Sequence, residues 1–246
     1  MQIQPDYYSA AADRNKQAIL DVLVGVVPEH GNALEIASGT GQHVAWFASG
    51  LPGWAWQPSD AQPDGFGSIN AWGAEQGVRN VREPVLIDVM AASWLPGQQQ
   101  FDLIYCANML HIAPWATCAG LMHGSARHLT PVGRLVTYGP YLEDGVPTSP
   151  GNLAFDESLR ERNPAWGIRR IEDVKAQAAK AGLRLLSRHA MPANNLLLVW
   201  VREPPTAQRQ RNPLKVVILE KQILTKRPHP DQTPSTPQTV QSLCRK

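Results

Sequence analysis

The sequence predicts an α/β fold whose mainly parallel β-sheet ends in an antiparallel hairpin. Segments with the helical spacing of apolar residues alternate with short apolar, strand-like segments, which is typical of βαβ units. The last two strand-like segments are separated only by "AMPAN" at 190–194. This linker is too short for a crossover helix, so we expect these two strands to pair antiparallel.

The first half of the chain opens with a helix, because Ile19, Leu23 and Val26 recur on one apolar face. The next strand breaks at glycines, and Gly50 ends the helix that follows. The elements expected in this half are a helix at 10–27, a strand at 33–37, a helix at 42–50, a strand at 54–59, a helix at 65–76 and a strand at 85–88.

The second half contains the strongest strand pattern, the apolar run "FDLIYCA". Gly182 follows an amphipathic segment and marks the end of a helix. The elements expected here are a strand at 101–107, a helix at 114–129, a strand at 133–138, a helix at 171–181 and strands at 183–189 and 195–202.

Composition narrows the class of protein. The 246 residues are 43% apolar, enough for a sizeable core, and the net charge is only +2 with the 23 basic residues scattered. Nucleic-acid binding, which needs a clustered basic face, is therefore not indicated. No apolar run approaches the roughly 18–20 residues of a membrane span.

Cysteine usage and the first residues bear on the compartment. The odd count of three cysteines has no metal-ligand spacing and indicates no disulfide framework or metal site. The start "MQIQPDYYSAAADRN" lacks the basic and apolar regions of a secretory signal. We expect a cytoplasmic protein with no metal and no membrane or nucleic-acid partner.

The composition changes at about residue 204. From there the chain is polar and rich in proline, as in "PPTAQRQRNP" and "RPHPDQTPSTPQTVQ". We expect a globular domain at 1–203 and a tail at 204–246 that is flexible or docks on a partner. Within this tail, "LKVVILEKQIL" is apolar enough to dock.

A glycine turn is the strongest candidate site. Gly39 and Gly41 follow the first strand and open a helix, where an open α/β sheet binds its ligands. Without a Cβ, glycine lets the backbone approach a ligand closely. Glu35 near this turn favours a ligand with an ammonium or sulfonium cation. S-adenosylmethionine carries both of these cations and no phosphate.

Two other interpretations of the turn remain open. A dinucleotide-binding turn, as in a nicotinamide-dependent oxidoreductase, would have glycine or alanine at position 44, where this chain has Val44. Its pyrophosphate would also avoid Glu35, since helix amino ends attract anions. Alternatively, the turn is purely structural.

Acids at the ends of the next two strands fit an adenosyl ligand. Asp60 follows Gly41 by 19 residues, close to the offset of about 20 for an acid that holds ribose hydroxyls. Asp88 would accept from the adenine amino group while Val89 offers its backbone amide. Both acids are also compatible with simple turn or helix caps.

The segment "CANMLHI" leaves the fourth strand beside this site. We expect Asn108 at the cofactor and Met109 against the adenine, although Met109 could equally fill the core. His111 is a candidate general base, with a structural histidine as the commoner alternative.

Several sequence blocks, taken together, resemble a known family. In order and spacing over about residues 10–202 they resemble methyltransferase-like protein 26 and its bacterial relatives, a family of unknown function. The blocks are "DRNKQAIL", "LEIASGTGQH", "WQPSD", "CANMLHI", "TYGPY", "RNPAWG" and "MPANN".

The resemblance implies the class I S-adenosylmethionine-dependent methyltransferase fold, a doubly wound, mostly parallel seven-stranded sheet with an antiparallel last strand. It also implies a set of cofactor contacts, namely Glu35, Ser38, Gly39, Gly41, Asp60, Asp88 and Asn108. Asp13 departs from the family's usual glutamate, and the tail lies outside the pattern. Ala37 departs only from the wider superfamily, which has glycine there.

Some residues in these blocks are not explained by the generic fold. Arg14, beside Asn15 in the first helix, could bind the methionine carboxylate or could be a solvated charge. After the fifth strand, Tyr138 and Tyr141 could bracket a methyl acceptor oriented by Asn152, or simply pack a loop. Trp166, in a structural turn, would close the core or wall the pocket.

The expected function is methyl transfer from S-adenosylmethionine to an unidentified acceptor, preferably a small molecule. Placing the nucleophile in line with the activated methyl group supplies most of the catalysis. If a base is needed, His111 and Tyr138 are the candidates. No "NPPY"-like motif follows the fourth strand, which argues against the methyltransferases that act on exocyclic amines or on glutamine. The alternative is a non-catalytic S-adenosylmethionine-binding module.

Overall fold

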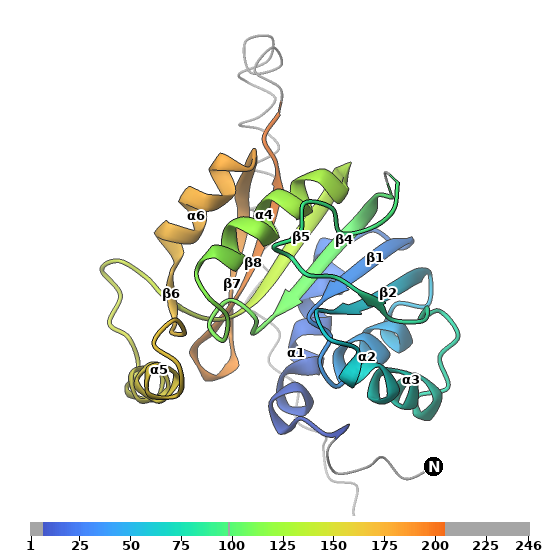
Figure 1. Ribbon diagram of the computed structural model, residues 1–246, viewed down its shortest axis with the longest axis horizontal. Helices are drawn as coiled ribbons and strands as arrows, with labels where there is room; N and C mark the ends of the chain where they lie inside the picture. The colour runs from blue at the N-terminus through green and yellow to red at the C-terminus, as the bar shows by residue number, and fades with distance from the viewer. Residues whose placement is uncertain (1–6, 98, 205–246) are drawn as a thin grey trace, which may run out of the picture. The chain divides into compact units, whose positions relative to one another are not determined.

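The computed structural model describes residues 7–97 and 99–204, which form a mixed sheet with helices on both faces (Figure 1). The strands are β1 (Gly31–Ile36), β2 (Trp54–Asp60), β3 (Val85–Leu86), β4 (Phe101–Ala107), β5 (Leu129–Leu142), β6 (Arg169–Arg170), β7 (Leu183–Met191) and β8 (Asn195–Arg202). The helices are α1 (Ala10–Val26), α2 (Gln42–Gly50), α3 (Phe66–Glu75), α4 (Ala116–His128), α5 (Pro150–Arg162) and α6 (Ile171–Lys180). Short 3₁₀ turns lie at Pro63–Gly65 and Pro192–Asn194.

The strand order is β3-β2-β1-β4-β5-β8-β7, and the two-residue β6 pairs with the end of β5. β1 to β5 pair parallel, and β8 lies antiparallel between β5 and β7. The predicted α/β fold, mostly parallel with an antiparallel end, is therefore confirmed. Successive strands are added to one side of β1 as far as β3 and to its other side from β4 on, so a topological switch point lies at the carboxyl ends of β1 and β4.

The two faces of the sheet bury separate apolar clusters. The face covered by α1, α2 and α3 buries Trp56 and Leu197, whereas the face covered by α4 and α6 buries Leu121 and Trp200 (Figure 1). Alternate residues of one strand enter opposite clusters, as the pleat requires. Both faces are buried, which accounts for the nearly continuous apolar strands.

The segment after the fifth predicted strand is a loop only at residues 143–149, so this part of the prediction was partly wrong. β5 continues through Tyr138 and Tyr141 to Leu142, and α5 follows at Pro150–Arg162. Tyr138 and Tyr141 enter opposite apolar clusters. They therefore cannot bracket one acceptor between them.

The β7–β8 hairpin was predicted with its linker at residues 190–194 and its second strand starting at Asn195. In the structure Ala193 and Asn194 have φ of 57° and 56°, and Asn195 already begins β8. Two successive residues with positive φ suit the right-handed twist of a tight hairpin. The antiparallel pairing is confirmed, and β8 begins at the predicted residue.

The expected division between a domain at 1–203 and a tail at 204–246 stays a prediction, because residues 205–246 lie outside the described part. None of the helices described in residues 7–97 and 99–204 has the length and apolar character that crossing a bilayer requires.

Close packing between α4 and the loop before β4 gives a stability prediction. A Cβ added at Gly124 would lie 1.9 Å from the Trp94 ring. We expect Gly124→Ala to destabilise the fold by about 1–3 kcal/mol through overpacking, measured by urea unfolding. The matched helical control, Gly151→Ala, meets no atom within 4 Å and should not destabilise. Equal stability of the two variants would contradict this packing.

Candidate functional site

The glycine turn lies at the carboxyl end of β1 and opens α2, as predicted. Gly39 and Gly41 have φ of 55° and 84°, a region that favours glycine. A Cβ at Gly41 would lie 2.5 Å from the Cα of Ile69, so Gly41 allows α3 to pack against the turn. A Cβ at Gly39 would meet nothing within 4 Å, so this glycine borders open space.

Glu35 is 2% exposed at the end of β1. Its Oε2 is enclosed and has no hydrogen-bond partner among the described residues. Burial raises the pKa of Glu35 to about 8, with a smaller contribution from Asp60, while a hydrogen bond with Ser38 opposes the rise. A buried acid without a counter-ion is a strong candidate for binding a cation.

Asp60 ends β2 and bonds to the glycine turn. Its Oδ2 accepts from the backbone amide of Gly39 at 3.0 Å, and its Oδ1 accepts from that of Ala61 at 2.8 Å. Ser38 ties the same strand ends together, since its Oγ accepts from the amide of Ser59 at 3.1 Å. The structure thus brings Glu35, Ser38, Gly39 and Asp60 together.

Asp88 and Val89 follow β3 at the edge of the sheet. The exposed Asp88 uses Oδ1 to accept from the backbone amide of Met90 at 2.8 Å, which matches the capping alternative. Val89 is buried, and its carbonyl accepts from Trp94 Nε1 at 3.3 Å. An exposed carboxylate retains free lone pairs, so this cap does not exclude a contact with adenine.

The segment after β4 carries Asn108, Met109 and His111. Asn108 has a φ of 59°, and its amide donates to the carbonyl of Tyr138 at 2.8 Å. Met109 is partly buried against the apolar cluster of the α4 face, matching the core-filling alternative. A Cβ at Gly139 would lie 3.3 Å from His111 Nδ1 and 3.6 Å from Asn108 Oδ1, so these two side chains meet at β5.

His111 is buried and neutral. Burial lowers the pKa of His111 to about 4, and the charges of Arg169 and Arg162 act in the same direction. The Phe155 ring of α5 packs edge-on at 5.5 Å. The free imidazole can accept a proton at neutral pH, although its low basicity limits its strength as a general base.

Arg169, which the sequence analysis did not single out, holds the His111 segment in place. Its guanidinium donates to the carbonyls of Leu110 at 2.9 Å and Ala113 at 2.6 Å. The amide of Gly167 donates to the carbonyl of His111 at 2.9 Å. The block "RNPAWG" and the residues after it therefore shape the segment after β4.

A buried polar cluster joins α1, α2, β5 and β8. Asn15 Oδ1 lies 2.6 Å from His43 Nε2. The hydroxyl of Tyr138 is hydrogen-bonded by the side chains of Asn15 and Asn195. Burial raises the pKa of Tyr138 despite these two bonds, which argues against its predicted role as a general base.

The other predicted residues lie in different places. Arg14 is exposed on α1. Tyr141 is buried, and its hydroxyl donates to Thr137 Oγ1 at 2.9 Å. Trp166 is half-buried, with the Arg162 guanidinium 5.6 Å from its ring, in the turn where it was expected. Asn152 donates from Nδ2 to the carbonyl of Asn194 at 3.1 Å.

Tyr141 and Asn152 line one pocket of about 190 Å³ between the end of β5, the start of α5 and the β7–β8 hairpin. An ion pair, in which Arg188 donates twice to Glu143 at 2.6 Å, forms part of its wall. The volume is below the roughly 300–1,000 Å³ of drug-sized ligand sites, so the pocket suits a smaller group.

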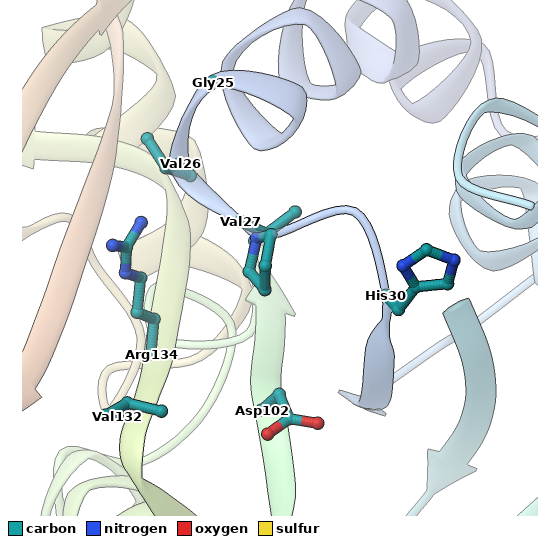
Figure 2. A pocket seen from close by; sticks show the side chains of 8 residues that line it. Gly25, Val26, Val27, His30, Asp102, Val132 and Arg134 are labelled. Carbon is teal, nitrogen blue, oxygen red and sulfur yellow. The ribbon is translucent and has the colours of Figure 1, made fainter. Parts of the chain in front are cut away.

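A second pocket, of about 500 Å³, lies at the amino ends of β4 and β5 and beside the end of α1. Figure 2 shows Arg134, Asp102 and His30 around it. None of the predicted site residues lines this pocket. Ligands of open α/β sheets bind at the carboxyl ends of the strands, so we do not assign it to the cofactor.

Among residues 7–97 and 99–204, no three or more histidine, cysteine, aspartate or glutamate side chains are grouped to hold a metal ion. Sequence reasoning missed the roles of His43 and Asn195. Both lie in blocks that carried the family resemblance, which was the signal that could have found them.

Comparison with protein families gives one match. Residues 6–202 match a family described as "Protein of unknown function (DUF938)". The match covers nearly all of the described residues.

Solved structures of methyltransferases share the fold. The mitomycin 7-O-methyltransferase MmcR matches with a TM-score of 0.62 and 16% identity over 70% of this chain and 49% of its own. CalO1, a methyltransferase in calicheamicin biosynthesis in an SAH-bound form, matches with a TM-score of 0.63 and 15% identity over 78% of this chain and 54% of its own. The S-adenosylmethionine-dependent methyltransferase SibL matches with a TM-score of 0.66 and 20% identity over 79% of this chain and 56% of its own. The chain thus spans about half the length of these proteins.

Proposed function

The chain belongs to the DUF938 family, and from its methyltransferase-like fold and its glycine turn we propose that it is an S-adenosylmethionine-dependent methyltransferase. We also propose that the chain is similar to methyltransferase-like protein 26, that its methyl acceptor is a small molecule and that it is located in the cytoplasm. Glu35 is the observation that carries it. A buried carboxyl beside a glycine turn, with one enclosed oxygen that has no hydrogen-bond partner, suits a cationic ligand and is unfavourable for a phosphate.

The residues present fit this cofactor. Glu35 would bind its ammonium group, and Asp60 would accept from the ribose hydroxyls with the lone pairs that Gly39 and Ala61 leave free. The open side of Gly39 would allow close approach of the ligand. Asp88, the Val89 amide and Met109 would contact the adenine, and Asn108 would lie beside the amino-acid end. Arg14 would add positive charge for the carboxylate.

When bound, the cofactor supplies an electrophilic methyl group. The protein's own contribution is then chiefly to orient the acceptor and exclude water. We propose that the acceptor enters by the 190 Å³ pocket lined by Tyr141 and Asn152. α5 borders both this pocket and, through Phe155, the His111 ring. Neutral His111 would take the proton of an alcohol acceptor, and Trp166 would support the nearby loop.

The test is turnover with labelled cofactor. Purified protein is incubated with methyl-labelled S-adenosylmethionine and a protein-free cell extract, and S-adenosylhomocysteine formation and transferred label are measured. The proposal expects both, with Asp60→Ala as the inactive control. Binding of the cofactor without turnover in extracts would instead favour the non-catalytic module. Binding of NAD in place of the cofactor would favour the oxidoreductase.

A further inference from the structure

Four of the blocks that carried the family resemblance meet in one buried cluster. Asn15 comes from "DRNKQAIL", His43 from "LEIASGTGQH", Tyr138 from "TYGPY" and Asn195 from "MPANN". The elements that carry them are far apart in the sequence. A generic α/β sheet does not need such a cluster, so these side chains call for a functional explanation.

The hydrogen bonds of the cluster have a direction. Asn15 Oδ1 can only accept, so His43 Nε2 donates to it across 2.6 Å. Burial lowers the pKa of His43 to about 4, which keeps the ring neutral and its single proton on Nε2. The amide nitrogen of Asn15 is then left to donate to Tyr138, and Asn195 supplies the second donor. A phenol oxygen that accepts from two donors can still donate its own proton, which makes the Tyr138 hydroxyl a candidate donor to a ligand.

The free donor lies at the cofactor end of the sheet. Tyr138 pairs in register with Ala107, the last residue of β4. His43 is the second residue of α2, whose amino end follows the glycine turn and favours negative charge. Tyr105 on β4 is the register partner of Glu35, and burial together with the charges of both Glu35 and Tyr138 raises the pKa of Tyr105. Glu35 therefore suits the ammonium group of an amino acid, and the Tyr138 hydroxyl suits its carboxylate.

We propose that Tyr138 donates a hydrogen bond to the carboxylate of the amino-acid end of S-adenosylmethionine. Asn15, His43 and Asn195 are positioning residues that keep the hydroxyl a donor. This inference rests on the proposed function, because it needs the cofactor at the glycine turn. It replaces the predicted role of Tyr138 as a general base, and it leaves Arg14 a supporting charge at most.

The experiment is a cycle between protein and ligand, measured by calorimetry. S-adenosylhomocysteine and its decarboxylated analogue, which keeps the ammonium group, are titrated into the wild type and Tyr138→Phe. The wild type should bind S-adenosylhomocysteine roughly 10- to 100-fold more tightly than Tyr138→Phe does, the scale of a hydrogen bond to a charged group. For the decarboxylated analogue, the two proteins should differ little.

The matched control is Tyr141→Phe. It removes a hydroxyl from the same strand, but that hydroxyl belongs to the opposite face and is bonded to Thr137. This variant should bind both ligands with the wild-type ratio of affinities.

Asn15→Asp tests the positioning without removing the hydroxyl. The substitution is nearly isosteric, but a carboxylate only accepts, so the Tyr138 hydroxyl would donate its hydrogen bond to residue 15 and no longer to the ligand. We expect the same selective loss of S-adenosylhomocysteine affinity, together with a raised His43 pKa in an NMR titration. If Tyr138→Phe does not fold, this variant and the two ligands still form a complete cycle.

The outcomes separate this inference from the proposed function. If the wild type binds S-adenosylhomocysteine but Tyr138→Phe and Asn15→Asp lose nothing, or lose both ligands equally, the inference is overturned and the proposed function stands. If the wild type binds neither ligand, both are overturned.

Discussion

Replacing Glu35 by glutamine is expected to remove a loss of stability that Glu35 alone contributes to the wild-type protein as the pH rises from about 4.5 to about 8. The pKa of Glu35 is raised in the folded state, chiefly by burial, so the native protein holds a proton that the unfolded chain has released. The contribution of Glu35 to the unfolding free energy therefore falls through this window. The expected slope is about 1.4 kcal/mol per pH unit, or several kcal/mol in total.

The opposite slope is expected at lower pH. Burial lowers the pKa of both His43 and His111 from 6.5 to about 4. The unfolded chain binds protons there that the native protein does not, so stability is lost as the pH falls through this range. Together with Glu35, these groups place the stability maximum near pH 6.5. Above this pH the histidines no longer add stability as the pH rises, whereas ionisation of Glu35 in the unfolded chain still lowers it.

Urea unfolding at several pH values from 5 to 9 measures these slopes. Glu35→Gln should gain stability relative to the wild type steadily as the pH rises from 5 to about 8. The control is Glu29→Gln, which changes an exposed glutamate and should keep the wild-type slope. Parallel curves for the wild type and Glu35→Gln would show that Glu35 does not hold a proton in the folded state.

The same carboxyl also links proton release to binding. At pH 7 Glu35 is mostly protonated, and a bound ammonium group favours its charged form. Binding of S-adenosylhomocysteine should therefore release close to one proton, seen by calorimetry in two buffers of different ionisation enthalpy. Glu35→Gln should abolish this buffer dependence.

Asp60→Ala is expected to weaken binding of S-adenosylhomocysteine by at least about 1–3 kcal/mol. The substitution removes a charged acceptor for the ribose and the acceptor that holds the Gly39 amide at 3.0 Å. Calorimetry measures the loss, and Asp64→Ala, an exposed acid four residues later, is the matched control.

A modified ligand separates the two contributions of Asp60. The 2′-deoxy analogue of S-adenosylhomocysteine lacks one ribose hydroxyl. The wild type should bind this analogue more weakly than the parent compound, whereas Asp60→Ala should bind the two equally. A wild-type protein indifferent to the 2′-hydroxyl, or an unchanged affinity in Asp60→Ala, would remove Asp60 from the ribose role.

The sequence predicted element bounds best where the apolar pattern is continuous and polar residues, glycine or proline mark its ends. The bounds of α2, β4 and β8 were predicted to the residue. β5 was predicted too short because Pro131, Gly133, Gly139 and Pro140 interrupt its pattern. These residues are tolerated since the neighbouring strands and clusters hold the backbone extended.

α5 could not be found from apolar periodicity. Leu159 is its one buried residue among those described, because the helix packs beside the sheet and not on it. Its capping signal was present, however. Ser149 accepts from the Asn152 amide at 3.3 Å, and Pro150 occupies the first turn.

The site was predictable only where glycines and acids follow or end neighbouring parallel strands. Glu35, Gly39 and Asp60 could be placed together because parallel strands end at one edge. The bond between Asn15 and His43 depends on how α1 packs on α2, which spacing within one segment does not encode. The same holds for Arg169, which reaches the His111 segment across more than fifty residues.

A crystal structure of the protein with S-adenosylhomocysteine would show where the cofactor product binds. We expect electron density for the ligand across the carboxyl ends of β1, β2 and β4, with its ribose at Asp60 and its ammonium group at Glu35. Density in the pocket beside Arg134, or crystals that never take up the ligand at saturating concentration, would contradict this expectation.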